Sequence, residues 1–174
     1  DATELARRMI DIGERVGRRV TAVLSGMDQP LGNAVGNALE VVEAIDTLRG
    51  AGPADFAEHC LLIGGEMLLL ANLAESPEAA HDTLERAVAS GAALERMRAW
   101  IAAQGGDARV IDDHSRLPQA PVRHVVTAPR DGVIAALDAR EVGETSVALG
   151  AGRAKKGDPV DLAVGIVLEA KIGD

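Results

Sequence analysis

The hydrophobic pattern of the chain changes once, close to residue 105, and this change limits the folds that the chain can adopt. Upstream of this point, apolar residues recur every three or four positions, which is typical of amphipathic helices. Downstream of about residue 123, glycines and short runs of β-branched residues are typical of turns and strands. The sequence therefore predicts a helix-rich region followed by a strand-rich region.

Capping residues and apolar spacing predict where the individual elements lie. Thr3 is expected to cap the first helix, and Ser76 followed by Pro77 is expected to begin the fourth. The expected helices are residues 3–16, 33–48, 54–73, 77–90, 92–103 and 140–149. The expected strands are residues 18–25, 123–129 and 133–138, with further strand-like residues at 160–174.

These elements predict an α/β chain in three parts. Residues 1–105 are expected to place a helical layer on part of a parallel-type sheet. Residues 106–122 read as a linker, and residues 123–174 as an α+β domain rich in strands. The chain has no initiator Met, and its last four residues resemble a turn that leads into another strand. We therefore expect a piece of a longer protein.

Composition disfavours several classes of protein. Aromatic residues make up 1% of the chain, so the core must be aliphatic, and base stacking on aromatic rings is disfavoured. A net charge of −9 also argues against nucleic acid as a partner. The single cysteine, Cys60, fits a reducing cytoplasm. The longest apolar run, residues 67–70, is too short to span a membrane.

The stretch MDQPLGNAVGNALEVVEAI, residues 27–45, is the most distinctive segment. Its glycine spacing does not match the dinucleotide fingerprint, and no lysine follows to make a P-loop. Two interpretations remain. The small residues, including Gly32 and Gly36, allow the helix to pack closely against a neighbour. Alternatively, backbone carbonyls before the helix, together with Glu43, form an oxygen site for a cation.

Three further clusters have a functional and a structural interpretation. The helical pair His59-Cys60 is expected to be half-buried without a special role. Residues 112–114, Asp-Asp-His, offer metal ligands, but adjacent loop residues rarely converge, which favours a solvated segment. The loop GAGRAKKGD, residues 150–158, either binds phosphate through Arg153 and its lysines or is exposed and flexible. No catalytic set of residues is apparent.

Several blocks, in order along the chain, carry a family resemblance. They are residues 27–45, GAGPADFAEHCLLIGGEML at 50–68, SGAALERMRAWIAAQGGDARVIDD at 90–113, APRDGVIAALDAREVG at 128–143, LGAGRAKKGDPVDLAVGIVL at 149–168 and AKIGD at 170–174. Together they resemble the C-terminal segment of the pyrimidine nucleoside phosphorylases and thymidine phosphorylases.

The resemblance implies phosphorolysis, in which inorganic phosphate cleaves thymidine or uridine into a free base and a pentose 1-phosphate. The family's phosphate- and base-binding motifs lie upstream of this segment and do not occur here. No catalytic or substrate-binding residue is therefore assigned, and the piece alone is expected to be inactive. The parent enzyme is expected to be a cytoplasmic homodimer, with no nucleic acid or membrane partner.

The resemblance also implies a structural potassium ion, as in bacterial members of the family. On this chain its ligands would be the carbonyls of Leu31 and Ala34 and the side chain of Glu43. The remaining ligands would lie on the absent phosphate loop. In the same way, Arg153 and Lys155 would lie on a mobile segment at the rim of the substrate cleft.

Two alternatives stay open. Residues 124–174 loosely resemble the barrel-sandwich fold of a lipoyl or biotinyl carrier, although Lys171 lacks the flanking residues that a carrier lysine needs. An archaeal AMP phosphorylase is the second alternative. Anthranilate phosphoribosyltransferases share the α/β core but lack the strand-rich C-terminal domain, which disfavours them.

Overall fold

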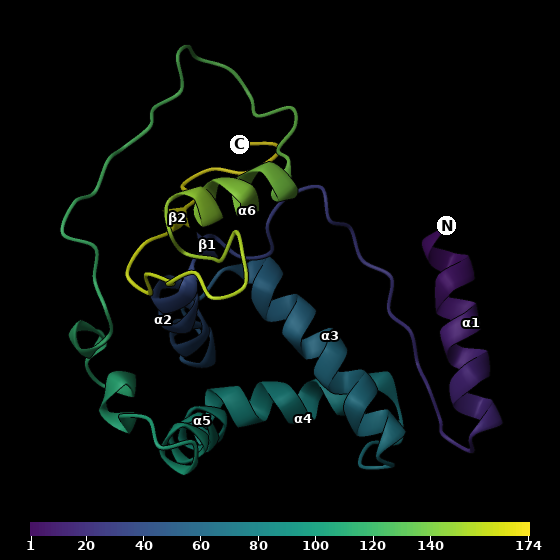
Figure 1. Cartoon of the computed structure of the whole chain (residues 1–174). Helices are drawn as coiled ribbons and strands as arrows, with labels where there is room; N and C mark the ends of the chain where they lie inside the picture. The colour runs from purple at the N-terminus through teal and green to yellow at the C-terminus, as the bar shows by residue number, and fades with distance from the viewer.

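Helices and one short sheet make up the regular structure of the computed structural model, which describes residues 1–174 (Figure 1). The helices are α1 (Ala2–Arg15), α2 (Asn37–Leu48), α3 (Ala54–Leu70), α4 (Pro77–Ala89), α5 (Ala92–Ala103) and α6 (Ala139–Ala148). Two 3₁₀ turns, η1 (Ala108–Ile111) and η2 (His114–Arg116), follow α5. Strands β1 (Ala34–Val35) and β2 (Ile166–Val167) form the sheet. All six expected helices are present, with their ends moved by a few residues.

Side-chain caps explain where several helices begin. The Ser76 hydroxyl accepts a hydrogen bond from the Ala79 amide at 3.2 Å, which confirms the expected start of α4. At α1 the cap is the Asp1 carboxylate, which accepts from the Thr3 amide at 2.9 Å, so the expected role of Thr3 is wrong. Asp138 caps α6 in the same way. A carboxylate is a better N-cap acceptor because it also opposes the positive end of the helix dipole.

The sheet differs from the parallel-type sheet that the sequence predicts. β1 and β2 run antiparallel, and Ala34 lies opposite Val167. The expected strands at 18–25, 123–129 and 133–138 are absent, and Figure 1 shows long loops there on either side of the body, although Ile134 exchanges backbone hydrogen bonds with Gly173 and Asp174. A strand needs a neighbour for its N–H and C=O groups. Since these segments have no partner strand here, their β-branched residues do not form a sheet.

The start of α2 lies against the C-terminal segment. A Cβ atom on Gly36 would lie 2.7 Å from the Val164 carbonyl oxygen and 2.8 Å from Gly165 Cα. The Ala38 amide donates to the Leu162 carbonyl at 3.1 Å and so satisfies an N–H group that a helix start leaves free. Gly36 is therefore a close-packing residue, as expected. Its neighbour is the C-terminal backbone and not a parallel sheet.

The buried core is small and entirely aliphatic. Ile45 of α2 and Val110 and Ile111 of η1 form its centre. Partly buried residues surround them: Val41, Leu94, Met97, Ile101 and Leu117. Two of the three central residues thus come from the segment 106–122 that was expected to be a linker. This core fixes α2 against α5 and thereby holds the helix that carries Glu43.

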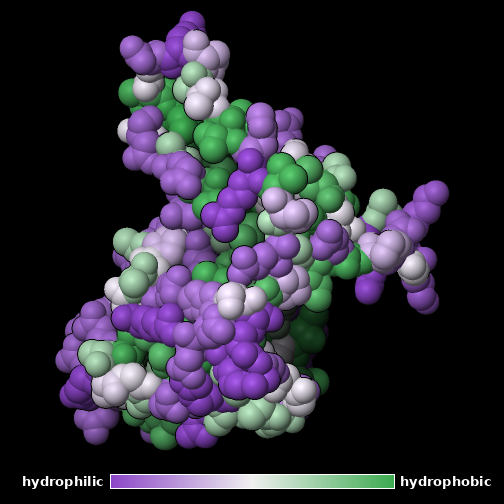
Figure 2. Space-filling view, turned by 90° about the vertical axis from the view of Figure 1, so that its left-hand side faces the viewer, coloured by the Kyte–Doolittle hydropathy of each residue, from purple (hydrophilic) through white to green (hydrophobic).

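The molecule exposes much more surface than a compact protein of its size. Its solvent-accessible surface is 12479 Å², whereas about 8,000 Å² is expected for a compact monomer of this mass. The apolar stripe of α1, which includes Leu5, Met9 and Ile12, is 59–65% exposed, and this helix stands apart from the body in Figure 1. Figure 2 shows hydrophobic residues at the surface in several patches. None of the helices is both long and apolar enough to cross a membrane.

Candidate functional site

Three successive backbone amides in the loop before β1 point at two carboxylates. The Asn33 and Ala34 amides donate to Glu43 Oε1 at 2.8 Å and 2.9 Å. The Gly32 amide donates to Asp55 Oδ2 at 3.3 Å. Successive N–H groups of this kind form a concave anion-binding turn, often called a nest. Here the anions come from the protein itself, from α2 and from the first turn of α3.

Gly32 is required by this arrangement for two reasons. Its φ of +71° lies in the left-handed region, which other residues adopt only at a cost. A Cβ atom at this position would also overlap Glu43 Oε2 and lie 3.0 Å from Glu43 Cδ. The glycine therefore allows the Glu43 carboxylate to lie directly over the loop.

Three oxygen atoms at this loop, those of the Leu31 and Ala34 carbonyls and Glu43 Oε2, take no part in the hydrogen bonds above. Both hydrogen bonds to Glu43 end on Oε1, so Oε2 is free to bind a cation. The Leu168 amide donates to the Asn33 carbonyl, and hydrogen-bonded pairs alternate along an antiparallel ladder. The Ala34 carbonyl therefore faces away from β2. The Leu31 carbonyl accepts no backbone hydrogen bond. One carboxylate and two carbonyls suit a hard cation of low charge.

Asp55 occupies a polar junction beside this loop. Its Oδ2 atom lies 2.5 Å from Lys171 Nζ and also accepts from Gly32. Partial burial raises the pKa of the Asp55 carboxyl, but the hydrogen bonds from Lys171 and Gly32 together lower it by more than burial raises it. The pKa of Asp55 therefore lies below the ordinary value. Sequence reasoning missed this contact because 116 residues separate its two partners. No local pattern reports such a pair.

A cavity of about 400 Å³ opens next to Glu43. Its lining combines carboxylates and apolar side chains: Asn33, Ala34, Leu39, Val42, Glu43, Asp46, Ala51, Gly52, Pro53 and Val167. The candidate cation site therefore borders open space on the side of β1 and α2.

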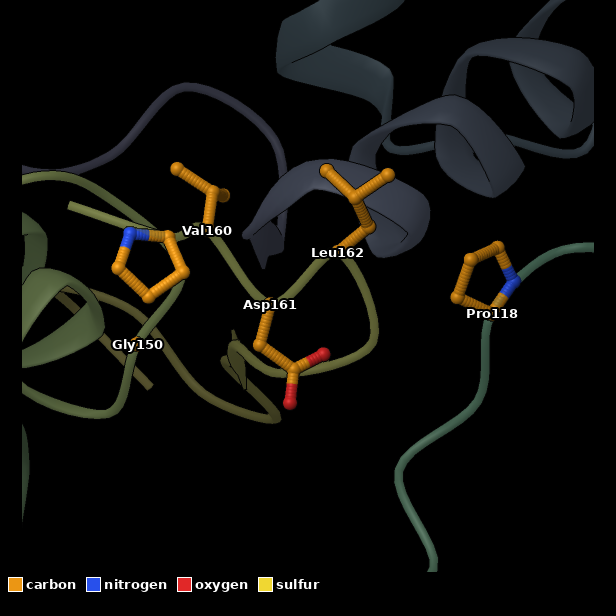
Figure 3. Close-up of a pocket in the computed structure, with 6 residues that line it drawn as sticks. Pro118, Gly150, Val160, Asp161 and Leu162 are labelled. Atoms are coloured by element: carbon orange, nitrogen blue, oxygen red, sulfur yellow. The ribbon is translucent and has the colours of Figure 1, made fainter. Parts of the chain in front are cut away.

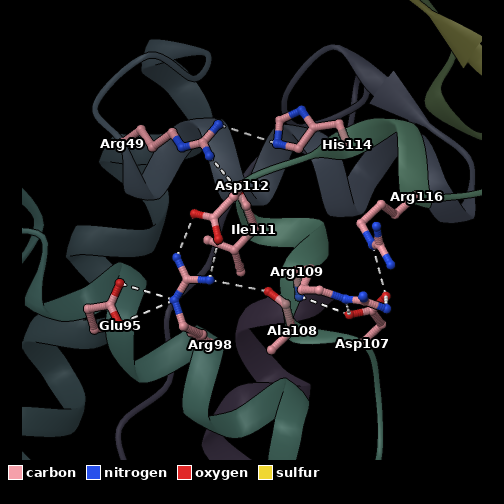
Figure 4. Close-up of polar contacts among 10 residues, drawn as sticks. All are labelled: Arg49, Glu95, Arg98, Asp107, Ala108, Arg109, Ile111, Asp112, His114 and Arg116. Atoms are coloured by element: carbon pink, nitrogen blue, oxygen red, sulfur yellow. Dashed lines mark hydrogen bonds and ion pairs between the residues drawn. The ribbon is translucent and has the colours of Figure 1, made fainter.

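The Asp112-Asp113-His114 cluster does not converge on a metal site, and Figure 4 shows Asp112 and His114 with different partners. Arg98 donates to both oxygens of Asp112 at 2.7 Å and holds the pKa of that carboxyl below its usual value. Asp113 caps η2, and the His114 ring lies 3.4 Å from an Arg49 nitrogen. The three side chains thus have separate partners. The expectation that adjacent loop residues do not converge is confirmed.

The basic loop 150–158 closes on itself. Arg153 donates to the Asp158 carbonyl at 3.1 Å, and the Lys155 amide donates to the Asp158 carboxylate at 2.8 Å. The neighbouring cavity of about 560 Å³ is lined by Pro118, Gly150, Pro159, Val160, Asp161 and Leu162 (Figure 3). Its charged lining residue is an aspartate, which suits an anion poorly. None of the loop's basic residues lines this cavity.

Two further groups of polar residues lie on α3 and α4. His59 is half-buried as expected, whereas Cys60 is exposed, which corrects the expectation for that residue. On α4, His81, Asp82 and Glu85 offer ligand atoms within 4.8 Å of one another. The i, i+4 spacing of His81 and Glu85 could have revealed this cluster from the sequence. All three side chains are exposed.

Comparison with known proteins identifies the family. Residues 1–94, which carry the candidate site, match the glycosyl transferase family, a/b domain. The chain belongs to this family. Residues 133–174 match the pyrimidine nucleoside phosphorylase C-terminal domain. The family resemblance stated from the sequence is thereby confirmed.

Individual members of the family align with the chain over its whole length. It is 53% identical to the pyrimidine-nucleoside phosphorylase of Geobacillus stearothermophilus. It is 49% identical to that of Bacillus subtilis (strain 168) and 51% identical to that of Staphylococcus aureus (strain USA300). In each case the alignment covers 100% of this chain and 40% of the relative. The chain thus spans less than half the length of these enzymes.

Proposed function

We propose that this chain is the C-terminal part of a pyrimidine-nucleoside phosphorylase. The longer enzyme would transfer the pentose of thymidine or uridine to inorganic phosphate and release the free base. The observation that carries the proposal is the alignment with pyrimidine-nucleoside phosphorylases, about half identical, along all 174 residues. The phosphate- and base-binding residues would lie outside this chain. This chain alone is therefore expected to have no activity.

The exposed apolar surface supports a role as one part of a larger fold. The stripe on α1 and the excess of accessible surface leave hydrophobic area that a compact enzyme would bury. We propose the division into residues 1–105, a connecting segment at 106–122 whose Val110 and Ile111 pack into the core of the first part, and a barrel-sandwich-like domain at 123–174. A homodimer in the cytoplasm is proposed for the longer enzyme.

A potassium ion is proposed as the structural cofactor at the loop before β1. Leu31 and Ala34 would supply carbonyl oxygens, and Glu43 would supply Oε2. The ion would add a positive charge that joins this loop to a phosphate-binding segment. Glu43 already orders the loop through the Asn33 and Ala34 amides, so the same carboxylate would fix the backbone and bind the ion.

The activity is tested by assaying the longer protein for release of uracil and thymine with and without phosphate. Strict dependence on phosphate is expected, and nucleoside hydrolysis without phosphate would refute the proposal. The archaeal alternative is tested in the same assay with AMP as substrate. The 174-residue chain serves as the inactive control.

The cofactor is tested by Glu43→Ala in the longer protein. Activity and thermal stability are expected to lose their dependence on potassium relative to sodium, because the only charged ligand on this chain is removed. Glu58→Gln on the exposed face of α3 is the matched control and should respond to potassium as the unchanged protein does. An unaltered potassium response in Glu43→Ala would exclude the metal role.

The structure argues against the carrier alternative. A lipoyl or biotinyl carrier needs its lysine at an exposed hairpin tip. The Lys171 side chain is only 14% exposed and is paired with Asp55. A modifying enzyme would first have to break this ion pair.

A further inference from the structure

The contact between Lys171 and Asp55 joins the C-terminal turn to the start of α3, beside the loop before β1. Lys171 Nζ lies 2.5 Å from Asp55 Oδ2, and the same oxygen accepts from the Gly32 amide at 3.3 Å. A second bond lies next to it, since the Ile172 amide donates to Gln29 Oε1 at 2.9 Å. The C-terminal turn thus contacts the first part of the loop directly, at Gln29, and is linked to its centre, at Gly32, through the Asp55 carboxylate.

Both partners of the ion pair are held by their own surroundings. The Lys171 amide donates to the Asp174 carboxylate at 2.8 Å, and the Asp174 amide returns a bond to the Lys171 carbonyl at 3.1 Å. Ile134 exchanges backbone hydrogen bonds with Gly173 and Asp174, which fixes this turn to the chain segment just before α6. A lysine on an ordered turn loses less conformational entropy in pairing than one on a flexible surface.

Asp55 is equally well placed. It lies in the first turn of α3, where the helix dipole favours a negative charge. Its second oxygen, Oδ1, accepts from the Phe56 amide at 2.9 Å. The carboxylate therefore has one oxygen bound to its own helix and the other shared between Lys171 and Gly32. A displacement of Lys171 would remove the ammonium group that holds the shared oxygen of Asp55 in place.

We propose that Lys171 and Asp55 form a clamp that positions residues 29–34 and the cation-binding oxygens of this loop. Both are positioning residues, since neither is among the proposed ligands. The effect on cation affinity rests on the proposed function, whereas the ordering of the loop does not. Through this clamp, the C-terminal region controls a site whose ligands belong to the N-terminal region.

The loop-ordering part is tested by amide hydrogen exchange in the 174-residue chain. In Lys171→Met, the Gly32, Asn33 and Ala34 amides are expected to exchange roughly tenfold faster, because Asp55, the acceptor of the Gly32 amide, has lost its charged partner and no longer holds the loop. Lys171→Arg should restore slow exchange. Arg140→Met, which removes an exposed ion pair on α6, is the matched control and should leave these amides unchanged.

Amides of α4 provide the internal reference. This helix lies far from the clamp in Figure 1, so equal acceleration there would mean global loosening and would overturn a local clamp. Unchanged exchange at Gly32, Asn33 and Ala34 in Lys171→Met would overturn it as well.

The cation part is tested in the longer protein by the potassium concentration that gives half of the full thermal stabilisation. For Lys171→Met, the loss of a positive charge and the loss of loop order predict opposite changes in the half-saturating potassium concentration. Removing a nearby positive charge would by itself tighten cation binding. Loss of loop order would instead raise the half-saturating potassium concentration, and we expect a rise of about fivefold to tenfold.

The double variant Asp55→Asn, Lys171→Met separates the two effects further. It removes both charges, so a rise in half-saturating potassium would come from lost positioning alone. A decrease or no change would overturn the role of the clamp in cation binding. If the unchanged protein shows no response to potassium, the proposed cofactor fails, and hydrogen exchange still decides whether the clamp orders the loop.

Discussion

Replacing Gly32 with alanine tests the physical basis of the candidate site most directly. The alanine would have to adopt a φ of +71°, which costs about 1–2 kcal/mol for a residue with a Cβ atom. Its Cβ would also overlap Glu43 Oε2. Since Oε2 is the far end of a flexible side chain, the carboxylate would move aside. Its bonds to the Asn33 and Ala34 amides would then be lost.

The expected loss of stability is the sum of the backbone strain and the two lost hydrogen bonds. The lost hydrogen bonds involve a half-buried carboxylate, and we take about 2 kcal/mol for the pair. Gly32→Ala is therefore expected to lower the free energy of unfolding by about 3–4 kcal/mol. Gly50→Ala is the matched control, because Gly50 has a φ of +79° and no atom within 4 Å of an added Cβ. It should cost only about 1–2 kcal/mol.

Urea denaturation followed by circular dichroism measures both values. A double-mutant cycle with Glu43→Ala isolates the contact between the two positions. Without the carboxylate, Gly32→Ala should cost no more than Gly50→Ala, so the effects of the two substitutions should not add. Equal costs for Gly32→Ala and Gly50→Ala in the otherwise unchanged chain would refute the reasoning.

Two further predictions concern the core and the response to acid. Ile45→Ala should lower the free energy of unfolding by about 2–5 kcal/mol, because this side chain is fully buried between α2 and η1; a loss below about 1 kcal/mol in urea denaturation would contradict the proposed core. Hydrogen bonds from Arg109 and Arg116 lower the pKa of Asp107, and hydrogen bonds from Arg98 lower that of Asp112. A lowered folded-state pKa stabilises the fold above the unfolded pKa near 4, and this stabilisation is lost as the pH falls further. The urea midpoint should therefore fall more steeply between pH 5 and pH 3 in the unchanged chain than in Asp112→Asn, and parallel curves would refute this.

The helices could be predicted from the sequence because their signals are local. Ser76, Pro77 and Gly91 mark helix boundaries within a few residues of their own position, and the structure confirms them. Hydrogen bonds within a helix join residues four apart, so a short window of sequence contains most of the information. The Asp1 cap was missed because two possible capping residues, Asp1 and Thr3, lie two positions apart at the start of α1.

The strands could not be predicted in the same way. The β-branched residues at 18–25 favour a strand, yet a strand forms only beside a partner that the local sequence does not specify. β1 and β2 pair across more than 130 positions; β2 lies within the strand-like residues expected at 160–174, whereas β1 lies where the start of a helix was expected. The burial of Val110 and Ile111 was also missed, because a short segment rich in charged residues resembles a linker until its tertiary contacts are known.

The sequence alone determined the helix order, the aliphatic nature of the core and the family resemblance that names Leu31, Ala34 and Glu43. Only the tertiary structure decided how the stretch 27–45 uses its two glycines. Gly32 makes room for the Glu43 carboxylate, and Gly36 makes room for the backbone of Gly165. The ion pair between Asp55 and Lys171 also depends on folding, because only the folded chain brings charges so far apart in sequence within hydrogen-bond distance.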